Sequence, residues 1–238
     1  MNILLLGYGK MGRMIDELAT AKGHHIAAKI NIDNYEDLND LDTDQIDVAI
    51  DFSQPSAAVS NIKWCIDHKI PVAVGTTGWL GQKEALDAYC IEHGGTYLYA
   101  SNFSIGVNIF FKVNEFLAKL MNGQTSYDIG MTEVHHTQKL DAPSGTAITL
   151  AKGVIAEVDR LNTWSKETAS NDSELPIKSE RVDPTPGTHV INYDSPIDSI
   201  EIKHTAHGRE GFATGAILVA EWITGQQGVL TMEDFLSL

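Results

Sequence analysis

Residues 133–147, with the sequence EVHHTQKLDAPSGTA, hold the densest group of side chains that could carry out chemistry. His135, His136 and Lys139 are three potential cations within 133–139, in a protein whose net charge is −15. An anionic ligand must be met by a local basic cluster that works against this overall charge. The segment therefore predicts a site for a small anionic substrate.

The second part of this segment strengthens that prediction. Ser144, Gly145 and Thr146 stand at the expected start of a helix, where hydroxyl and amide donors can bind a carboxylate. A His-His pair with a later Asp is also compatible with a metal. However, Lys139 would repel a cation and no further ligand spacing is evident, so we expect no metal. The favoured ligand is a small molecule with more than one carboxylate.

A glycine motif near the start of the chain predicts a dinucleotide site. The sequence GYGKMG follows a buried apolar run and opens a helical pattern, as the G-x-G-x-x-G motif requires. The glycines allow a tight turn, close approach to a pyrophosphate and close helix packing, and the helix start supplies amide donors. The expected contacts are Gly7, Tyr8, Gly9, Lys10, Met11 and Gly12, with Arg13 adding charge nearby.

Later strand ends add to the same site, because ligands of open α/β sheets bind beyond the carboxyl ends of the strands. The second strand ends at Asn31, with Asp33 two residues on and no arginine to accept a 2′-phosphate. This favours NADH weakly over NADPH. Two small, polar loops follow later strands and are expected to face the nicotinamide: Gly75, Thr76 and Thr77, and then Ala100, Ser101, Asn102 and Phe103.

The elements that must position these groups alternate between strand and helix in the first half. Apolar runs at 2–7, 25–31, 47–52, 71–78 and 95–104 are expected strands or strands with their exit loops. Helices are expected at 10–23 and 53–69, the second with Ser53 as its cap and Pro55 in its first turn. This rhythm predicts a parallel sheet covered on both faces.

The pattern changes after Gly106. An amphipathic helix is expected at 107–123, a strand at 127–136 and a helix from Gly145 onward. Residues 162–176 are polar and predict a loop. Alternating segments at 188–195 and 199–206 predict antiparallel strands, and 215–225 a last helix. The best domain boundary lies near 104–107.

Composition excludes several function classes. The charge of −15 argues against nucleic acid and anionic membranes as partners. No apolar run is long enough for a membrane span, and residues 2–6 run directly into a glycine turn. Residues 33–51 carry eight acidic residues and no lysine or arginine, as a solvated loop and helix face would. Cys65 and Cys90 are expected to be buried free thiols, so we expect a cytoplasmic protein.

The chain also resembles a known family, 4-hydroxy-tetrahydrodipicolinate (dihydrodipicolinate) reductase. The match rests on E-x-H-H-x-x-K-x-D-A-P-S-G-T-A, on the glycine motif and, in the same order, on AIDFSQP (49–55), VGTTG (74–78), SNFSIGVN (101–108) and IKHTAHGREGFATGA (202–216). It covers almost the whole chain. The resemblance implies an α/β protein with a Rossmann-type dinucleotide-binding domain, 1–106 with 209–238. It also implies a smaller α+β domain, 107–208, with a mostly antiparallel or mixed sheet, which binds substrate and assembles a homotetramer.

The resemblance also implies residue roles. It makes His135 the general acid/base and Lys139 the proton donor. His136, Ser144, Gly145 and Thr146 would bind the substrate. The implied cofactor contacts are the glycine turn, Asn31, Phe52, 75–77, 100–103 and Arg209. The expected reaction is NAD(P)H-dependent reduction of a cyclic imine that carries two carboxylates, in lysine biosynthesis.

Two other functions remain as alternatives at this point. A different Rossmann dehydrogenase, for an amino acid or a sugar acid, would leave the His-His-Lys-Asp segment unexplained. A non-catalytic nicotinamide sensor would bind cofactor without turnover, and no basic recognition helix supports a DNA-linked form.

Overall fold

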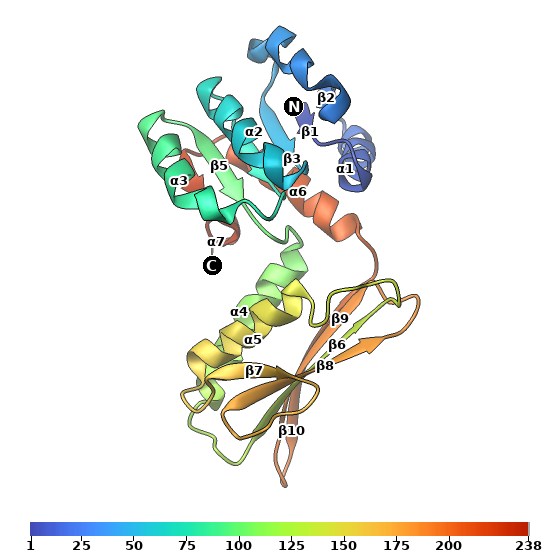
Figure 1. Cartoon of the computed structure of the whole chain (residues 1–238), viewed down its shortest axis with the longest axis vertical. Coiled ribbons are helices and arrows are strands. Elements are labelled where there is room, and N and C mark those ends of the chain that lie inside the picture. Colours follow the sequence, from blue (N-terminus) through green and yellow to red (C-terminus); the bar gives the residue numbers. More distant parts are fainter. Residues whose placement is uncertain (238) are drawn as a thin grey trace. The chain divides into compact units, whose positions relative to one another are not determined.

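The computed structural model describes residues 1–237 and contains two compact units (Figure 1). Unit 1 consists of residues 1–105 and the residues from Glu210 onward. Unit 2 is Gly106–Arg209. The chain therefore builds most of unit 1, then the whole of unit 2, and returns to complete unit 1.

Unit 1 contains a parallel sheet, as the sequence predicted, but with six strands, because β11 near the end of the chain adds to the five expected. Its strand order is β11-β5-β4-β3-β1-β2. The strands are β1 (Asn2–Leu6), β2 (His25–Ile30), β3 (Val48–Asp51), β4 (Val72–Val74), β5 (Thr96–Tyr99) and β11 (Gly228–Leu230). Because β2 and β3 lie on opposite sides of β1, the direction of winding reverses between β1 and β3. Ligands of open α/β sheets bind at such a reversal.

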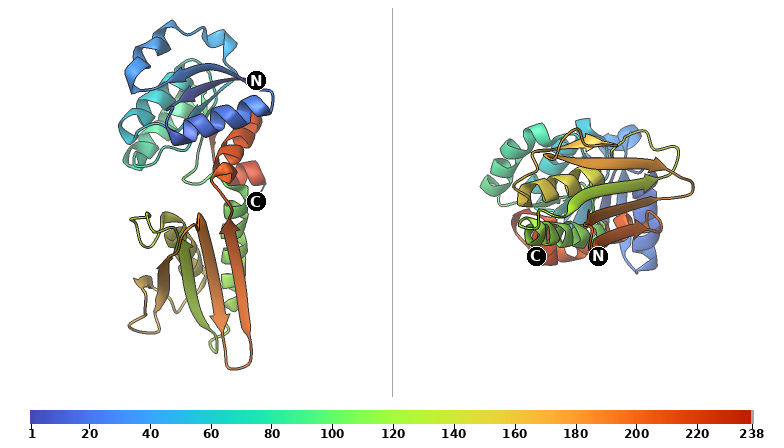
Figure 2. Two further views of the ribbon diagram at one scale, coloured as in Figure 1. Left: turned by 90° about the vertical axis from the view of Figure 1, so that its right-hand side faces the viewer. Right: turned by 90° about the horizontal axis from the view of Figure 1, so that it is seen from below.

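Helices cover both faces of this sheet (Figures 1 and 2). One core joins the sheet to α1 (Lys10–Ala21), α6 (Glu210–Ile223) and α7 (Met232–Leu236). The core on the opposite face joins it to α2 (Pro55–Asp67) and α3 (Lys83–Glu92). Three short 3₁₀ helices complete the unit: η1 (Ile32–Asp40), η2 (Thr43–Gln45) and η3 (Leu80–Gln82). The central strands are buried on both sides, which explains their continuous apolar sequences.

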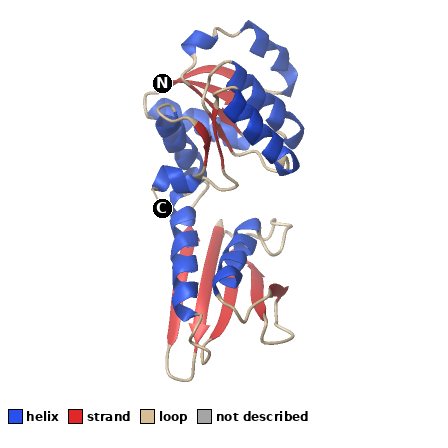
Figure 3. Cartoon of the chain, turned by 90° about the vertical axis from the view of Figure 1, so that its left-hand side faces the viewer, coloured by secondary structure: helices blue, strands red, loops and turns tan. Residues whose placement is uncertain are grey.

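Unit 2 is a five-stranded mixed sheet with helices on one face (Figure 3). The strand order is β10-β9-β6-β8-β7; β6 pairs antiparallel with β9 and parallel with β8. The strands are β6 (Asp128–His135), β7 (Thr163–Lys166), β8 (Glu174–Arg181), β9 (Gly187–Asp194) and β10 (Ser199–Ala206). The helices α4 (Ile105–Met121) and α5 (Gly145–Glu157) share one apolar core with the inner face of the sheet. The expected α+β architecture is confirmed.

Three details of the sequence interpretation are wrong. Ser53 does not cap α2, because the N-cap is Gln54 and the Ser53 hydroxyl is bonded to Asp51. Residues 162–176 are not one loop, since β7 and the start of β8 lie within them. The last long helix begins at Glu210 rather than at Gly215.

The cysteines and the lengths of the helices were also subjects of prediction. Both cysteines are free and buried, Cys65 in α2 and Cys90 in α3. Among the described residues, no helix combines the length and the apolar character that a membrane crossing needs.

Candidate active site

The glycine turn lies where β1 and β3 end, at the reversal of the sheet. Gly7 has φ +92°, a conformation that side chains disfavour, and a Cβ there would lie 2.3 Å from the carbonyl oxygen of Phe52. A Cβ on Gly12 would lie 2.2 Å from the carbonyl oxygen of Gly7. These two glycines therefore allow the turn and α1 to pack tightly beside the end of β3.

Gly9 differs because it faces open space. A Cβ at this position would meet no atom within 4 Å. Gly9 is also the N-cap of α1, and no side chain caps this helix start. Uncapped amides next to an open glycine suit the approach of a pyrophosphate. Lys10, the next residue, is exposed beside the same helix start.

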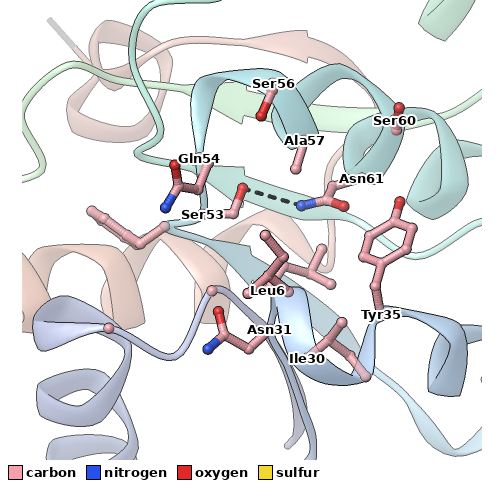
Figure 4. Close-up of a pocket in the computed structure, with 14 residues that line it drawn as sticks. Leu6, Ile30, Asn31, Tyr35, Ser53, Gln54, Ser56, Ala57, Ser60 and Asn61 are labelled. Carbon is pink, nitrogen blue, oxygen red and sulfur yellow. Dashed lines mark hydrogen bonds between the residues drawn. The ribbon is translucent and has the colours of Figure 1, made fainter.

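Two adjoining cavities surround this turn, and Figure 4 shows the larger one. The larger has a volume of about 550 Å³ and the smaller about 340 Å³. Gly9, Phe52 and Ser53 line both. The larger is also lined by Leu6, Gly7, Ile30, Asn31, Ile32, Tyr35, Gln54, Ser56, Ala57, Ser60 and Asn61, and the smaller by Lys10, Met11, Pro55, Gly75, Thr76 and Thr77. Most of the predicted cofactor contacts thus line one continuous region of unit 1.

A buried carboxylate holds several residues of this cavity lining in place. Asp51 is fully buried at the end of β3 and accepts hydrogen bonds from the Thr76 hydroxyl, the Asn61 side chain and the Ser53 amide. Burial raises the pKa of Asp51, although these bonds act in the opposite direction. Asp51 and Asn61 were not among the predicted contacts. The sequence signals that could have revealed them are weak: Asp51 is a polar residue at the end of a strand, and Asn61 is a polar residue on the buried side of a helix.

Other predicted cofactor contacts do not line these cavities. The Tyr8 hydroxyl donates to Asp16, so this side chain is directed to α1. Phe103 is buried and packs on Phe52 with ring centroids 5.7 Å apart. The residues that line the two cavities do not include Tyr8, nor the segment Ala100, Ser101, Asn102 and Phe103. Arg209 is exposed in the segment between β10 and α6.

The second polar cluster lies in unit 2 and is built around Glu133. This residue is completely buried on β6, and both carboxylate oxygens lie within 3.1 Å of the Ser144 amide. Ser144 is the N-cap of α5, and its hydroxyl accepts the amide of Ala147. Glu133 therefore fixes the helix start at which Gly145 and Thr146 stand. A Cβ on Gly145 would meet no atom within 4 Å, so this helix start is open.

His135 lies on the same face of β6 as Glu133 and is nearly buried. Its Nδ1 atom is 3.4 Å from a Glu133 oxygen. Its other side packs on Gly187, where a Cβ would lie 3.1 Å from Nε2. Burial lowers the pKa of His135, and Lys139 and Arg181 lower it further, while Glu133 raises it. The ring is therefore neutral at pH 7.

The structure brings only some of the predicted polar residues together. The Lys139 ammonium bonds to Asp141, at 2.8 Å, within the loop after β6. His136 follows the last residue of β6 and is half-buried. Among the described residues, no ion pair or hydrogen bond joins the His136 side chain to Glu133. The cluster instead contains two residues that the sequence did not reveal, Arg181 and His189.

Arg181 and His189 come from the neighbouring strands. Arg181 Nη2 is 3.4 Å from Glu133, and His189 Nε2 is 3.2 Å from the Ser144 hydroxyl. Ligand atoms of Glu133, His135 and His189 lie within 4.8 Å of one another, which is a spacing compatible with a metal. However, the Glu133 oxygens already face the Ser144 amide and the Arg181 guanidinium. Because these donors already occupy the Glu133 carboxylate, it is poorly placed to act as a metal ligand.

A Rossmann-type unit with an open glycine turn, combined with an α+β unit that holds a histidine and lysine cluster, defines a dinucleotide-dependent oxidoreductase. Comparison with known families gives the particular one. Residues 1–103 match the family model described as dihydrodipicolinate reductase, N-terminus, and residues 106–236 match dihydrodipicolinate reductase, C-terminus. The chain belongs to the dihydrodipicolinate reductase family, which removes the alternative of another Rossmann dehydrogenase.

Individual relatives agree with this assignment. The chain is 48% identical to 4-hydroxy-tetrahydrodipicolinate reductase of Christiangramia forsetii, over 100% of this chain and 98% of the relative. It is 33% identical to the enzyme of the same name from Methanosarcina barkeri, over 100% and 99%. Among solved structures, a dipicolinate-bound dihydrodipicolinate reductase from Paenisporosarcina sp. TG-14 shares the fold. Its TM-score is 0.80 at 22% identity, covering 97% of both chains.

Proposed function

We propose that this chain converts 4-hydroxy-tetrahydrodipicolinate to tetrahydrodipicolinate in the diaminopimelate pathway of lysine biosynthesis. The 4-hydroxyl group leaves as water, and the resulting conjugated imine takes up one hydride and one proton. The observation that carries the proposal is the pair of family matches, which together span both units. The polar cluster of unit 2 supports it, because the substrate is a cyclic imine with two carboxylates. The cluster offers cations and an open helix start that can bind these two carboxylates.

The residues of unit 1 fit a nicotinamide dinucleotide. The open space at Gly9 and the uncapped start of α1 suit the pyrophosphate, and Thr76 and Thr77 line the adjoining cavity. The Asn61 Oδ1 atom is buried without a hydrogen-bond partner at the larger cavity. When bound, the nicotinamide supplies the hydride that reduces the ring carbon conjugated with the imine.

The chain's own residues then supply the proton that the reduced substrate must take up. We assign this role to His135, acting through Nε2, because Nδ1 is buried against Glu133. Burial lowers the pKa of His135 and keeps the ring neutral, and the two carboxylates of a substrate would raise this pKa and favour protonation. Lys139 is the second proton donor of the site. It becomes available when a substrate carboxylate replaces Asp141 as the partner of its ammonium group.

Substrate carboxylates would be held by the start of α5 and by the basic residues around it. Ser144 orients this helix start, and Gly145 and Thr146 are its first residues. His136 is half-buried, so its ring is accessible to an anion. These contacts would fix the ring so that hydride and proton arrive at adjacent atoms.

The direct test is oxidation of NADH or NADPH with the product of the preceding synthase step. His135→Gln and Lys139→Ala should each lower kcat by about 10²-fold, while the cofactor dissociation constant stays unchanged. Lys152→Met on the exposed side of α5 is a control with the same charge change as Lys139→Ala. Full turnover in both site variants would remove these residues as proton donors.

We also propose that NADH is the preferred cofactor. The Asn31 amide is bonded by the Asn34 side chain at the edge of the larger cavity, and acidic residues follow. Lys29, the nearby cation, is paired with Asp16 at 2.6 Å. This environment would repel a 2′-phosphate. The dissociation constant should be at least about tenfold lower for NADH than for NADPH. Asp33→Arg should reduce this difference in affinity more than the control Asp40→Arg does. Tighter binding of NADPH to the unchanged protein would refute this preference.

Assembly as a homotetramer in the cytoplasm completes the proposal. Both helices of unit 2 lie on one face of its sheet, so the other face is left to residues such as Thr132, Val134 and Val190, all half-buried. A second copy could cover this face. Two buried free thiols suit a reducing compartment. Sedimentation equilibrium should give the mass of four chains; a monomer would contradict the assembly.

A further inference from the structure

Arg181 directs each nitrogen of its guanidinium to a protein acceptor. Nε donates to the carbonyl oxygen of Lys139, at 3.3 Å, and Nη2 to that of Asp141, at 2.7 Å. Nη1 donates to the carbonyl oxygen of Glu180 on its own strand, at 2.9 Å. Each nitrogen thus has a protein acceptor, and two of these acceptors belong to the loop that carries Lys139. Arg181 is therefore arranged to hold that loop and not to bind a substrate carboxylate.

Glu133 completes the attachment of the same loop. Its Oε1 atom is 3.4 Å from Arg181 Nη2, and both oxygens accept the amide of Ser144. The loop from His136 to Pro143 is thus fixed at its start by β6, in its middle by Arg181 and at its end by Ser144. Burial raises the pKa of Glu133, but the hydrogen bonds from Ser144 and Ser179 outweigh it and lower this pKa, so the carboxylate is charged.

From this geometry we propose that Glu133 and Arg181 act as a positioning pair, which sets Lys139 and the start of α5 at fixed places relative to His135. The inference rests on the proposed function. Neither residue is assigned contact with the substrate. Their effect is to hold the proton-bearing groups and the carboxylate-binding amides in one arrangement before the substrate arrives.

The pair also makes opposite electrostatic contributions to His135. The charged and titratable groups around this ring are Glu133 on β6, Arg181 on β8, His189 on β9, and Lys139 and Asp141 in the loop. Glu133 raises the pKa of His135 and Arg181 lowers it. Loss of the carboxylate therefore shifts the His135 titration to lower pH, and loss of the guanidinium shifts it to higher pH.

Three variants separate positioning from simple destabilisation. Arg181→Met removes charge and donors, Arg181→Lys keeps the charge but loses the planar fork, and Glu133→Gln keeps the shape but loses the charge. For each, kcat and KM for the imine are measured from pH 5 to 9 with NADH, together with the NADH dissociation constant and the thermal unfolding midpoint. Lys152→Met is the control and should match the unchanged protein, since Lys152 is exposed on α5.

We expect kcat/KM to fall at least about 30-fold in Arg181→Met and in Arg181→Lys, with NADH binding unchanged within about twofold. The high-pH limit of kcat should move to higher pH in Arg181→Met, stay in place in Arg181→Lys, and move to lower pH in Glu133→Gln. Should Arg181→Met not fold, the other two variants decide.

Equal pH profiles in all three variants, or full activity of Arg181→Lys, would overturn the positioning role. These results are distinct from failure of the proposed function, in which the unchanged protein itself would not reduce the imine.

Discussion

At the scale of single residues, the polar cluster of unit 2 depends on a histidine that stays neutral. His189 packs edge-on against His135, with ring centroids 5.2 Å apart, and its Nε2 atom lies 3.2 Å from the Ser144 hydroxyl. Burial is the main cause that lowers the pKa of His189 to about 4. A neutral ring can support the residue that caps α5 without placing another buried charge in the cluster.

This shifted pKa predicts that unit 2 loses stability in mild acid. Between pH 6.5 and 4 the unfolded chain binds a proton at His189 and the folded chain does not, so stability falls as pH falls through this window. The loss attributable to His189 approaches about 3 kcal/mol at pH 4. Hydrogen exchange of the β6 and β9 amides, measured from pH 7 to 4.5 and corrected for intrinsic rates, would report it.

Two histidine-to-asparagine variants separate the effect of His189 from that of other groups. His189→Asn should flatten this pH dependence, because the new side chain does not titrate in the window. His207→Asn changes an exposed histidine of the same unit and should leave the slope as it is. An unchanged slope in His189→Asn would show that other groups cause the acid sensitivity.

At the scale of elements, the cofactor region of unit 1 depends on the close approach of α6 to the loop after β5. A Cβ on Gly215 would lie 1.9 Å from the carbonyl oxygen of Phe103 and 3.4 Å from its Cβ. Phe103 in turn packs on Phe52, which lines both cavities. A helix from the end of the chain therefore sets the position of an aromatic residue at the nucleotide site.

Gly215→Ala should consequently damage both stability and cofactor binding. The backbone atoms that a methyl group would meet cannot yield as a side chain can, so we expect a loss of at least about 2 kcal/mol in unfolding free energy. The dissociation constant for NADH should rise as Phe103 and Phe52 shift.

Urea unfolding and fluorescence titration of NADH would measure the two effects. Gly211→Ala in the first turn of α6 is the matched control, because the nearest atom to its Cβ, the Ser104 hydroxyl, is 3.7 Å away. Identical behaviour of both variants would mean that the contact at Phe103 does not matter.

The elements of unit 1 were largely predictable because their sequence signals are local. Buried parallel strands read as short apolar runs, and glycines close the helices and turns that follow them. The missed strands of unit 2, β7 and β8, alternate weakly: in β8 only Leu175 and Ile177 are apolar residues that face the core, and the remaining residues of the strand are polar or proline. Their pairing with β6 supplies the order that the local pattern lacks.

The site was predictable to the extent that its residues are neighbours in sequence. Gly7 to Gly12 and His135 to Thr146 lie in single segments, whereas Arg181 reaches Glu133 from 48 residues away. Such a contact depends on the order of strands in the sheet, which no local spacing records. Glu133 itself could have been selected, since it precedes His135 by two residues and a strand places such residues on one face.

At the scale of the whole molecule, the chain consists of two units with separate cores. Unit 1 has an apolar core on each face of its sheet, and unit 2 has one core beneath α4 and α5. The glycine turn and its cavities belong to unit 1, and the Glu133 cluster belongs to unit 2. Each ligand should therefore stabilise mainly the unit that binds it.

Hydrogen exchange with one ligand at a time tests this division of roles. NADH at 100 times its dissociation constant should slow exchange in unit 1 up to about 100-fold, equivalent to about 2.7 kcal/mol, in amides that open through unfolding of that unit. Pyridine-2,6-dicarboxylate, a planar analogue of the substrate, should instead protect β6 and the start of α5. Equal protection of both units by either ligand alone would contradict separate binding, because a ligand stabilises only the states with which it interacts differently. Protection of unit 1 alone by both ligands would move the dicarboxylate site away from His135 and Lys139, and with it the proposed source of the proton.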